Sequence, residues 1–145
     1  MGDLSKDINS SFANERVKAL INIKYTANWL NNRGNMLLKP HKISLQQYNI
    51  LRILKGAQKD IAVNTVRDRM IEKSPNATRL MDKLCDKKLI ERTRCNEDRR
   101  IVYVKITSLG LQLLESININ NFDNQMQAIT ETEAKTLNYL LDKIR

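Results

Sequence analysis

The residues with the clearest chemical potential are arginines around a short polar turn. Asp98, Arg99 and Arg100 are adjacent, and Arg92 and Arg94 precede them by a few positions. Arginine suits the narrow, electronegative minor groove of DNA. An acid two residues before an arginine can hold its guanidinium by a charge-assisted hydrogen bond. This group therefore indicates a nucleic-acid contact, although an exposed hairpin with compensating charges is the alternative for these residues alone.

A second polar group precedes the arginines and has helical spacing. Its members are Ser74, Asn76, Thr78, Arg79 and Lys83. A helix with polar side chains at its N-terminal end can enter the major groove and read base edges. In that position Arg79 could pair with guanine and Asn76 with adenine, while the helix N-terminus attracts a phosphate. A solvated helix face is the alternative reading of this group.

Catalysis has little support in the sequence. His41 is the single histidine, and the chain has no nucleophile motif, no P-loop and no dinucleotide-binding glycine pattern. We therefore expect no enzyme activity, no metal site and no cofactor. The chain carries 25 Lys and Arg against 16 Asp and Glu, a formal charge of +9. That charge favours a polyanionic partner, and nucleic acid suits it better than a membrane because the basic residues do not segregate on one amphipathic helix.

Length and composition predict one mostly helical globular domain over residues 1–145. The sequence is 41% hydrophobic and holds only four glycines and two prolines, too few for the many tight turns of a sandwich or barrel. No apolar run approaches the roughly 20 residues that span a bilayer, and the first residues are polar. We expect a cytoplasmic protein.

The elements that must position the polar groups can be placed from caps and periodicity. Ser44 to Gln47 is a capping box that opens a helix to about Lys55, with Gly56 at its stop. Asn64 is placed to cap a short helix to Met70, and Ser74 to cap the next one. Two short helices joined by a brief break form a helix-turn-helix.

A β-hairpin follows the second of these helices. Residues 90–94 and 100–106 are the only convincing strands, and Val102, Val104 and Ile106 alternate along one face. A hairpin directly after a helix-turn-helix makes a winged helix-turn-helix. The predicted fold class is therefore mainly α with a small β-hairpin, and residues 44–107 form its DNA-binding lobe.

Further helices flank this lobe on both sides. Residues 7–38 read as one long helix that ends near Pro40, and helices are also expected over 108–118 and 131–143. The first carries a heptad-like apolar stripe of Leu20, Ile23, Ala27, Leu30, Gly34 and Leu37. These stripes exceed what one small core uses, so residues 1–39 and 108–145 are predicted to be dimerisation helices of a homodimer.

The core of the chain resembles the MarR family of transcription regulators. The resemblance rests on residues 74–84, 89–92, 98–100 and 106–110, in that order and spacing. It implies a triangular homodimer whose recognition helices occupy major grooves while wing arginines reach the flanking minor grooves. By this matching Arg100 is the minor-groove residue, Asp98 positions it, and Arg99 meets a phosphate. The family usually ends the recognition helix with glycine, where this chain has Lys88. Either Lys88 takes the left-handed conformation in its place, or the helix ends differently and the wing is re-aimed.

Weaker signals concern regulation. Relatives in this family bind small effectors where the dimerisation helices meet the DNA-binding lobe, which singles out Tyr25, Trp29, His41 and Tyr48, although aromatics at helical spacing are more often core. Cys95 lies among arginines that could lower its pKa, so redox sensing is a minor variant. Cys85, on the recognition helix, is more simply an inert small residue.

The sequence thus predicts a homodimeric regulator, a repressor that binds a pseudo-palindromic site in double-stranded DNA and is relieved by a small-molecule effector. Two alternatives stay open, namely nonspecific architectural DNA binding and the use of the winged helix for protein–protein contacts.

Overall fold

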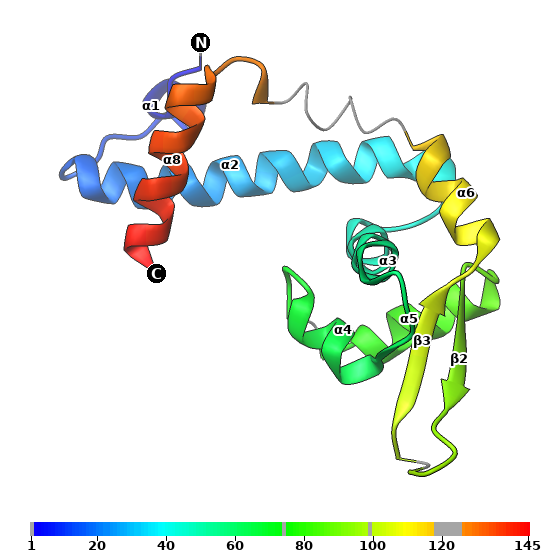
Figure 1. Ribbon diagram of the computed structural model, residues 1–145. Coiled ribbons are helices and arrows are strands. Elements are labelled where there is room, and N and C mark those ends of the chain that lie inside the picture. The colour runs from blue at the N-terminus through cyan, green and yellow to red at the C-terminus, as the bar shows by residue number, and fades with distance from the viewer. Residues whose placement is uncertain (1, 74, 99, 118–125) are drawn as a thin grey trace. The chain divides into compact units, whose positions relative to one another are not determined.

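The protein is described here from a computed structural model, which places residues 2–73, 75–98, 100–117 and 126–145 (Figure 1). The chain divides into two compact units at the junction of Leu37 and Leu38. Helices predominate and one small antiparallel sheet accompanies them, which confirms the predicted fold class. Among the described residues, no helix is both long and apolar enough to cross a bilayer.

The first unit contains α1 (Leu4–Asp7) and most of α2 (Glu15–Leu38). The prediction of one continuous helix from residue 7 is wrong over its first turns. Asn9 adopts a left-handed φ of 48°, which interrupts helical hydrogen bonding, and asparagine tolerates this conformation better than most residues. The Asn14 side chain then accepts a hydrogen bond from the Val17 amide at 3.0 Å, so the long helix begins directly after this polar cap.

The second unit opens with a single 3-10 turn, η1 (Lys39–His41), which contains Pro40, and continues into α3 (Leu45–Ala57). The capping box of α3 is confirmed, because Ser44 Oγ accepts from the Gln47 amide at 3.2 Å and Gln47 Oε1 accepts from the Ser44 amide at 3.1 Å. The predicted stop at Gly56 is wrong. The helix continues through Gly56, and the left-handed residue is Gln58, with φ 54°, where the chain turns toward the sheet.

The sheet has a third strand that the periodicity did not reveal. β1 (Ile61–Ala62) pairs antiparallel with β3 (Val102–Ile106), which also pairs with β2 (Ile90–Arg94), so the order is β1-β3-β2. α4 (Val63–Arg69) follows β1 without a break. The predicted cap at Asn64 is therefore wrong, because Ala62, held extended by strand pairing, occupies the cap position.

The remaining helices lie close to their predicted limits. α5 (Ala77–Asp86) begins after Asn76, and the predicted cap Ser74 lies outside the described residues. α6 (Ser108–Ser116) is capped by Thr107, whose hydroxyl accepts from the Gly110 amide at 3.1 Å. α8 (Glu131–Ile144) starts at the predicted Thr130–Glu133 capping box.

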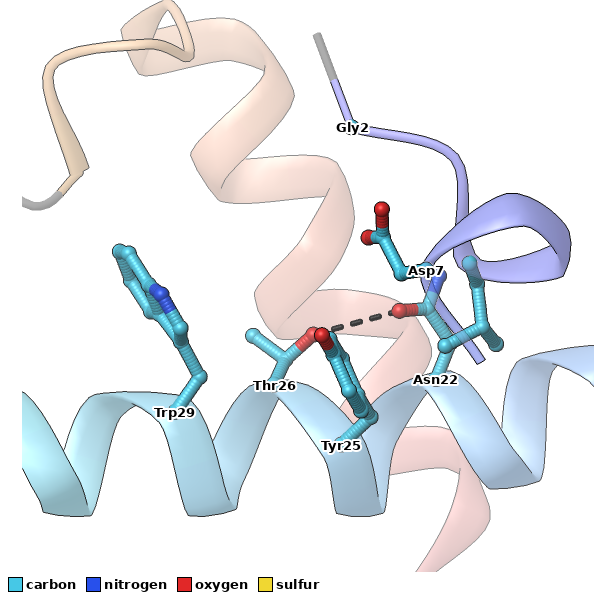
Figure 2. A pocket seen from close by; sticks show the side chains of 7 residues that line it. Gly2, Asp7, Asn22, Tyr25, Thr26 and Trp29 are labelled. Atoms are coloured by element: carbon cyan, nitrogen blue, oxygen red, sulfur yellow. Dashed lines mark hydrogen bonds between the residues drawn. The ribbon is translucent and has the colours of Figure 1, made fainter. Parts of the chain in front are cut away.

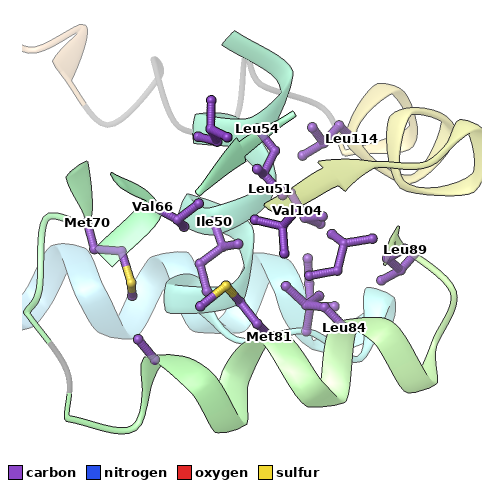
Figure 3. Close-up of a cluster of buried hydrophobic side chains, with 14 of the residues drawn as sticks. Ile50, Leu51, Leu54, Val66, Met70, Met81, Leu84, Leu89, Val104 and Leu114 are labelled. Carbon is purple, nitrogen blue, oxygen red and sulfur yellow. The ribbon is translucent and has the colours of Figure 1, made fainter. Parts of the chain in front are cut away.

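One hydrophobic core holds the second unit together (Figure 3). α3, α4, α5, α6 and the sheet all contribute to it, through Ile50, Leu51, Leu54, Val66, Met70, Met81, Leu84, Leu89, Val104 and Leu114. Met81 and Leu84 of α5 are fully buried in it. Because its inner face is fixed in this core, α5 must turn its opposite face outward.

Candidate nucleic-acid interface

α5 presents the polar face that the sequence predicts. Ala77, Met81 and Leu84 are buried at one-turn intervals, and this burial determines which positions face solvent. The side chains of Asn76, Thr78, Arg79 and Lys83 are all exposed. Ser74, the fifth residue of the predicted group, lies outside the described residues. The exposure is as predicted, and contact of these side chains with bases or phosphates stays a prediction.

The wing is the hairpin of β2 and β3, in register from Ile90 opposite Ile106 to Arg94 opposite Val102. Its tip is closed by backbone hydrogen bonds from Cys95 N to Ile101 O and from Ile101 N to Asp98 O, each 3.0 Å long. Asp98 Oδ1 accepts from the Arg100 backbone amide at 2.9 Å. This bond fixes the backbone at Arg100, whereas the residue types predict a bond from Asp98 to the guanidinium. Arg99 lies outside the described residues.

A hollow of about 400 Å³ brings the wing and both helices of the helix-turn-helix together. Its lining residues are Ala62, Val63, Asn64, Arg67, Thr78, Arg92, Arg100, Ile101 and Val102. Three of them are arginines. Arg92 is paired with Asp82 of α5, and Arg67 and Arg100 supply the remaining positive charge of the lining among the described residues. The hollow therefore joins the two predicted groups into one basic surface, which suits the phosphates of a nucleic acid.

α4 adds residues to this surface that were not predicted from the sequence, namely Asn64, Arg67 and Asp68. A second hollow, of about 610 Å³, is lined by Asn64, Arg67, Asp68, Lys73 and Pro75 at the N-terminal side of α5. Asn64 and Arg67 line both hollows. Their spacing of three on a short helix was a usable signal, but the assignment of Asn64 as a cap hid it.

Two arginines of the wing differ in their surroundings. Arg94, at the end of β2, is exposed. Arg92 is half-buried, and its guanidinium contacts α5: Nη1 lies 2.5 Å from Asp82 Oδ1 and Nη2 donates to the Thr78 carbonyl at 3.2 Å. The structure thus places Arg92 against α5, while the end of the wing carries Arg94 and Arg100.

The four residues predicted for an effector pocket are divided between the two units. Tyr25 and Trp29 line a pocket of about 380 Å³ in the first unit, with Gly2, Leu4, Asp7, Asn22 and Thr26 (Figure 2). Thr26 Oγ1 donates to Asn22 Oδ1 at 3.2 Å, and the Arg33 guanidinium lies 4.9 Å from the centre of the Trp29 ring. His41 in η1 and Tyr48 in α3 belong to the second unit. A pocket shared by the four residues stays a prediction.

The two cysteines are free thiols, and both are half-buried. Burial raises the pKa of the Cys85 thiol, and the nearby Arg92 charge opposes that rise only in part. Cys85 is therefore a poor thiolate near neutral pH, in line with an inert role. Redox sensing through Cys95 stays a prediction. Within the part of the chain that the structure describes, no three His, Cys, Asp or Glu side chains are grouped to hold a metal ion.

The turn between α5 and the wing takes the left-handed alternative of the two that the sequence left open. Lys88 has φ 58°, in the left-handed region. Its amide donates to Cys85 O at 2.8 Å, and the next amide, Leu89 N, donates to Leu84 O at 3.0 Å. These bonds end the helix in the way that a glycine at this position would end it, and β2 begins two residues later, at Ile90.

Comparison with known proteins agrees with this geometry. The family model described as transcriptional regulator SarA/Rot matches residues 34–117. The HTH-type transcriptional regulator YpoP of Bacillus subtilis is 31% identical over 108 residues, which are 71% of this chain and 74% of that protein. Among solved structures, a mutant MarR from E. coli complexed with operator DNA is 25% identical with a TM-score of 0.79, covering 93% of this chain and 99% of that chain. A MarR transcription factor from Planctomyces limnophilus is 29% identical with a TM-score of 0.69, over 92% and 97% of the two chains.

Proposed function

The chain belongs to the MarR family of winged helix-turn-helix transcriptional regulators, and from this premise we propose that it represses transcription by binding a specific double-stranded DNA site as a homodimer. Proteins of this kind are regulators and not enzymes. We place the activity in the cytoplasm, and we propose that a small-molecule effector relieves the repression.

The observation that carries the proposal is the basic surface shared by α4, α5 and the wing. The exposed polar residues of α5 have the side-chain types that read base edges in the major groove. Arg100 on the wing lines the same hollow as Thr78 of α5. In a complex with α5 in the major groove, Arg100 would be the side chain for the flanking minor groove. Arg67 and Lys73 add cations for phosphates next to the same helix.

Exposed apolar side chains on the flanking helices support the homodimer. Leu20 of α2 is 55% exposed, and Leu140 and Ile144 of α8 are 50% and 70% exposed. Large aliphatic side chains at helical spacing are seldom left in water in such numbers. A second copy of the chain would cover them, and a two-fold dimer would match a pseudo-palindromic site.

The pocket beside Tyr25 and Trp29 supports the effector. It lies on α2, one of the proposed dimerisation helices, so a ligand there could favour a dimer whose lobes are wrongly spaced for DNA. Relief would then be a shift in population toward a form with lower DNA affinity.

The test is a fluorescence titration of the protein against a duplex that it selects from a randomised library and against a scrambled duplex, at two salt concentrations. We expect strong preference for the selected duplex, and we expect Arg100→Ala to remove much of it. Lys135→Ala, which removes one positive charge from α8 outside the winged lobe, is the matched control and should leave the preference intact.

Equal, salt-sensitive binding to both duplexes would contradict sequence-specific repression and favour architectural binding. Failure to bind either duplex would favour protein contacts through the winged helix. Preference retained in Arg100→Ala as in Lys135→Ala would place Arg100 outside the interface.

A further inference from the structure

We propose that Arg92 and Asp82 form a brace that sets α5 relative to the wing, so that Arg92 supports DNA reading as a positioning residue and not as a DNA contact. The contacts of Arg92 within the protein, its burial and the sign of its partner's charge carry this inference. Its consequence for DNA binding rests on the proposed function, but the brace itself can be tested without DNA.

Arg92 is fixed at both ends. Its backbone lies in β2 opposite Val104 of β3, which is almost fully buried in the core. Its guanidinium bonds to α5 at two points one helical turn apart, the Thr78 carbonyl at 3.2 Å and the Asp82 carboxylate at 2.5 Å. The forked guanidinium can make both bonds at once, which a lysine ammonium on its flexible stem cannot reproduce. Strand and helix are therefore tied side by side.

These contacts leave Arg92 poorly suited to touch DNA. Its side chain is only 27% exposed. Its Nε is buried and has no hydrogen-bond partner within the described residues, so the inner edge of the guanidinium faces protein. Turning the group outward to a phosphate would break both bonds to α5. Arg94, by contrast, is exposed and can reach outward without such a loss.

The brace acts where α5 is predicted to read bases. The Thr78 carbonyl accepts a hydrogen bond from Arg92. The side chains of Thr78 and Arg79 belong to the polar face of α5. Recognition depends on side chains held to within about 0.5 Å by the shell that supports them. A helix freed from the wing at this point would present Thr78 and Arg79 over a wider range of positions.

Removing the Asp82 charge tests the brace, because the brace and the charge predict opposite effects on DNA binding. A carboxylate beside a DNA-binding surface repels phosphates, so its removal should by charge alone tighten binding to any duplex. If Asp82 braces the interface, Asp82→Asn should instead weaken binding to the selected duplex, although the protein loses a negative charge. The two effects have opposite sign.

Asp86→Asn is the matched control. It makes the same charge change on α5 one turn further along, at an exposed residue that no recorded ion pair holds within the described residues. We expect Asp82→Asn to lose roughly tenfold in affinity for the selected duplex and to gain slightly on the scrambled one. Asp86→Asn should keep or slightly raise both affinities. Tighter binding of Asp82→Asn to both duplexes would overturn the proposal.

The salt dependence separates positioning from phosphate contact at Arg92. Arg92→Lys keeps the charge but loses the fork, so it should weaken specific binding and leave the slope of log affinity against log salt unchanged. If Arg92 met a phosphate, Arg92→Lys would retain the affinity, and Arg92→Gln would reduce the slope by about 0.9. That pair of results would overturn the proposal.

A measurement without DNA keeps the brace testable if no duplex is selected. Hydrogen exchange of the backbone amides of α5 should become faster in Asp82→Asn and in Arg92→Lys than in Asp86→Asn, with circular dichroism showing that all three fold. Equal exchange in the three variants would overturn the brace. Faster exchange without any selected duplex would uphold the brace and count against the proposed function alone.

Discussion

Lys88 occupies a backbone position that favours glycine. Its φ of 58° brings the β-carbon close to its own backbone, which costs a residue other than glycine about 1 kcal/mol. Lys88→Gly removes that strain but also gives the unfolded chain more freedom, which offsets part of the gain. We therefore expect Lys88→Gly to be neutral or to stabilise the fold by up to about 1 kcal/mol in thermal unfolding. Lys88→Ala, which keeps a β-carbon, should gain nothing, and a clear fall in Tm for the glycine variant would contradict the account.

Gly110 is required for a different reason, namely space. A β-carbon there would lie 2.3 Å from the Leu89 carbonyl oxygen and 2.7 Å from Ile106 Cγ1. The neighbours are backbone and a β-branched side chain, so Gly110→Ala should cost several kcal/mol, on the order of 3, or prevent folding. Gly56→Ala is the control, because nothing lies within 4 Å of its β-carbon and alanine favours the helix by about 1 kcal/mol. Denaturant unfolding measures the stability of both variants. A Gly110→Ala variant as stable as the unchanged protein would contradict the close packing of α6 against Leu89 and Ile106.

Helix caps show what the sequence could predict among the elements. The boxes at Ser44 and Thr130 act within four residues, so local sequence suffices to place α3 and α8. β1 is only two residues long and exists because it pairs with β3, whose partner residues lie about forty positions away. No local pattern encodes such a pairing. The same pairing moved the start of α4 from Asn64 to Val63.

In the candidate site too, the features set by local sequence could be predicted, and those set by contacts between elements could not. The outward face of α5 follows from the period of its buried residues, which the sequence displays directly. The bonds from Arg92 to Thr78 and Asp82 join a strand to a helix, so residue type and spacing could not separate Arg92 from Arg94. The Asp98 bond to the Arg100 amide likewise depends on the conformation of the turn.

The capping box of α8 contributes to the stability of the folded protein, and this contribution depends on pH. Hydrogen bonds from the Thr130 amide and hydroxyl to Glu133, 2.7 and 2.8 Å long, hold the pKa of that carboxyl below its ordinary value of 4.5. Because the pKa of Glu133 is lower in the folded than in the unfolded state, its stabilising effect is fully present above the pKa of the unfolded state. That effect is lost as pH falls through the pKa of the folded state. Glu133→Gln keeps the cap acceptor but does not titrate. The Tm of this variant should therefore fall less steeply below about pH 4.5 than the Tm of the unchanged protein. Identical curves of Tm against pH in the acid range would contradict this.

The whole molecule is expected to be a dimer that depends on the stripe of α2. Leu20 belongs to that stripe and is 55% exposed in the single chain, so Leu20→Lys should place a charge in the proposed interface. We expect sedimentation to show a shift from dimer to monomer and the Tm to become lower. Asn32→Lys adds the same charge on α2 off the stripe and should leave the dimer intact. A monomeric unchanged protein, or equal effects of both variants, would contradict the homodimer.

The central claim is that two copies of this chain read one DNA site through α5 and the wing. The most direct measurement is selection from a randomised duplex library, followed by sequencing and by the stoichiometry of protein on the recovered duplex. The account predicts a pseudo-palindromic sequence, with half-sites about one helical turn apart, that binds two copies of the chain. A library that stays random after selection, or a recovered site without symmetry that binds one copy, would contradict it.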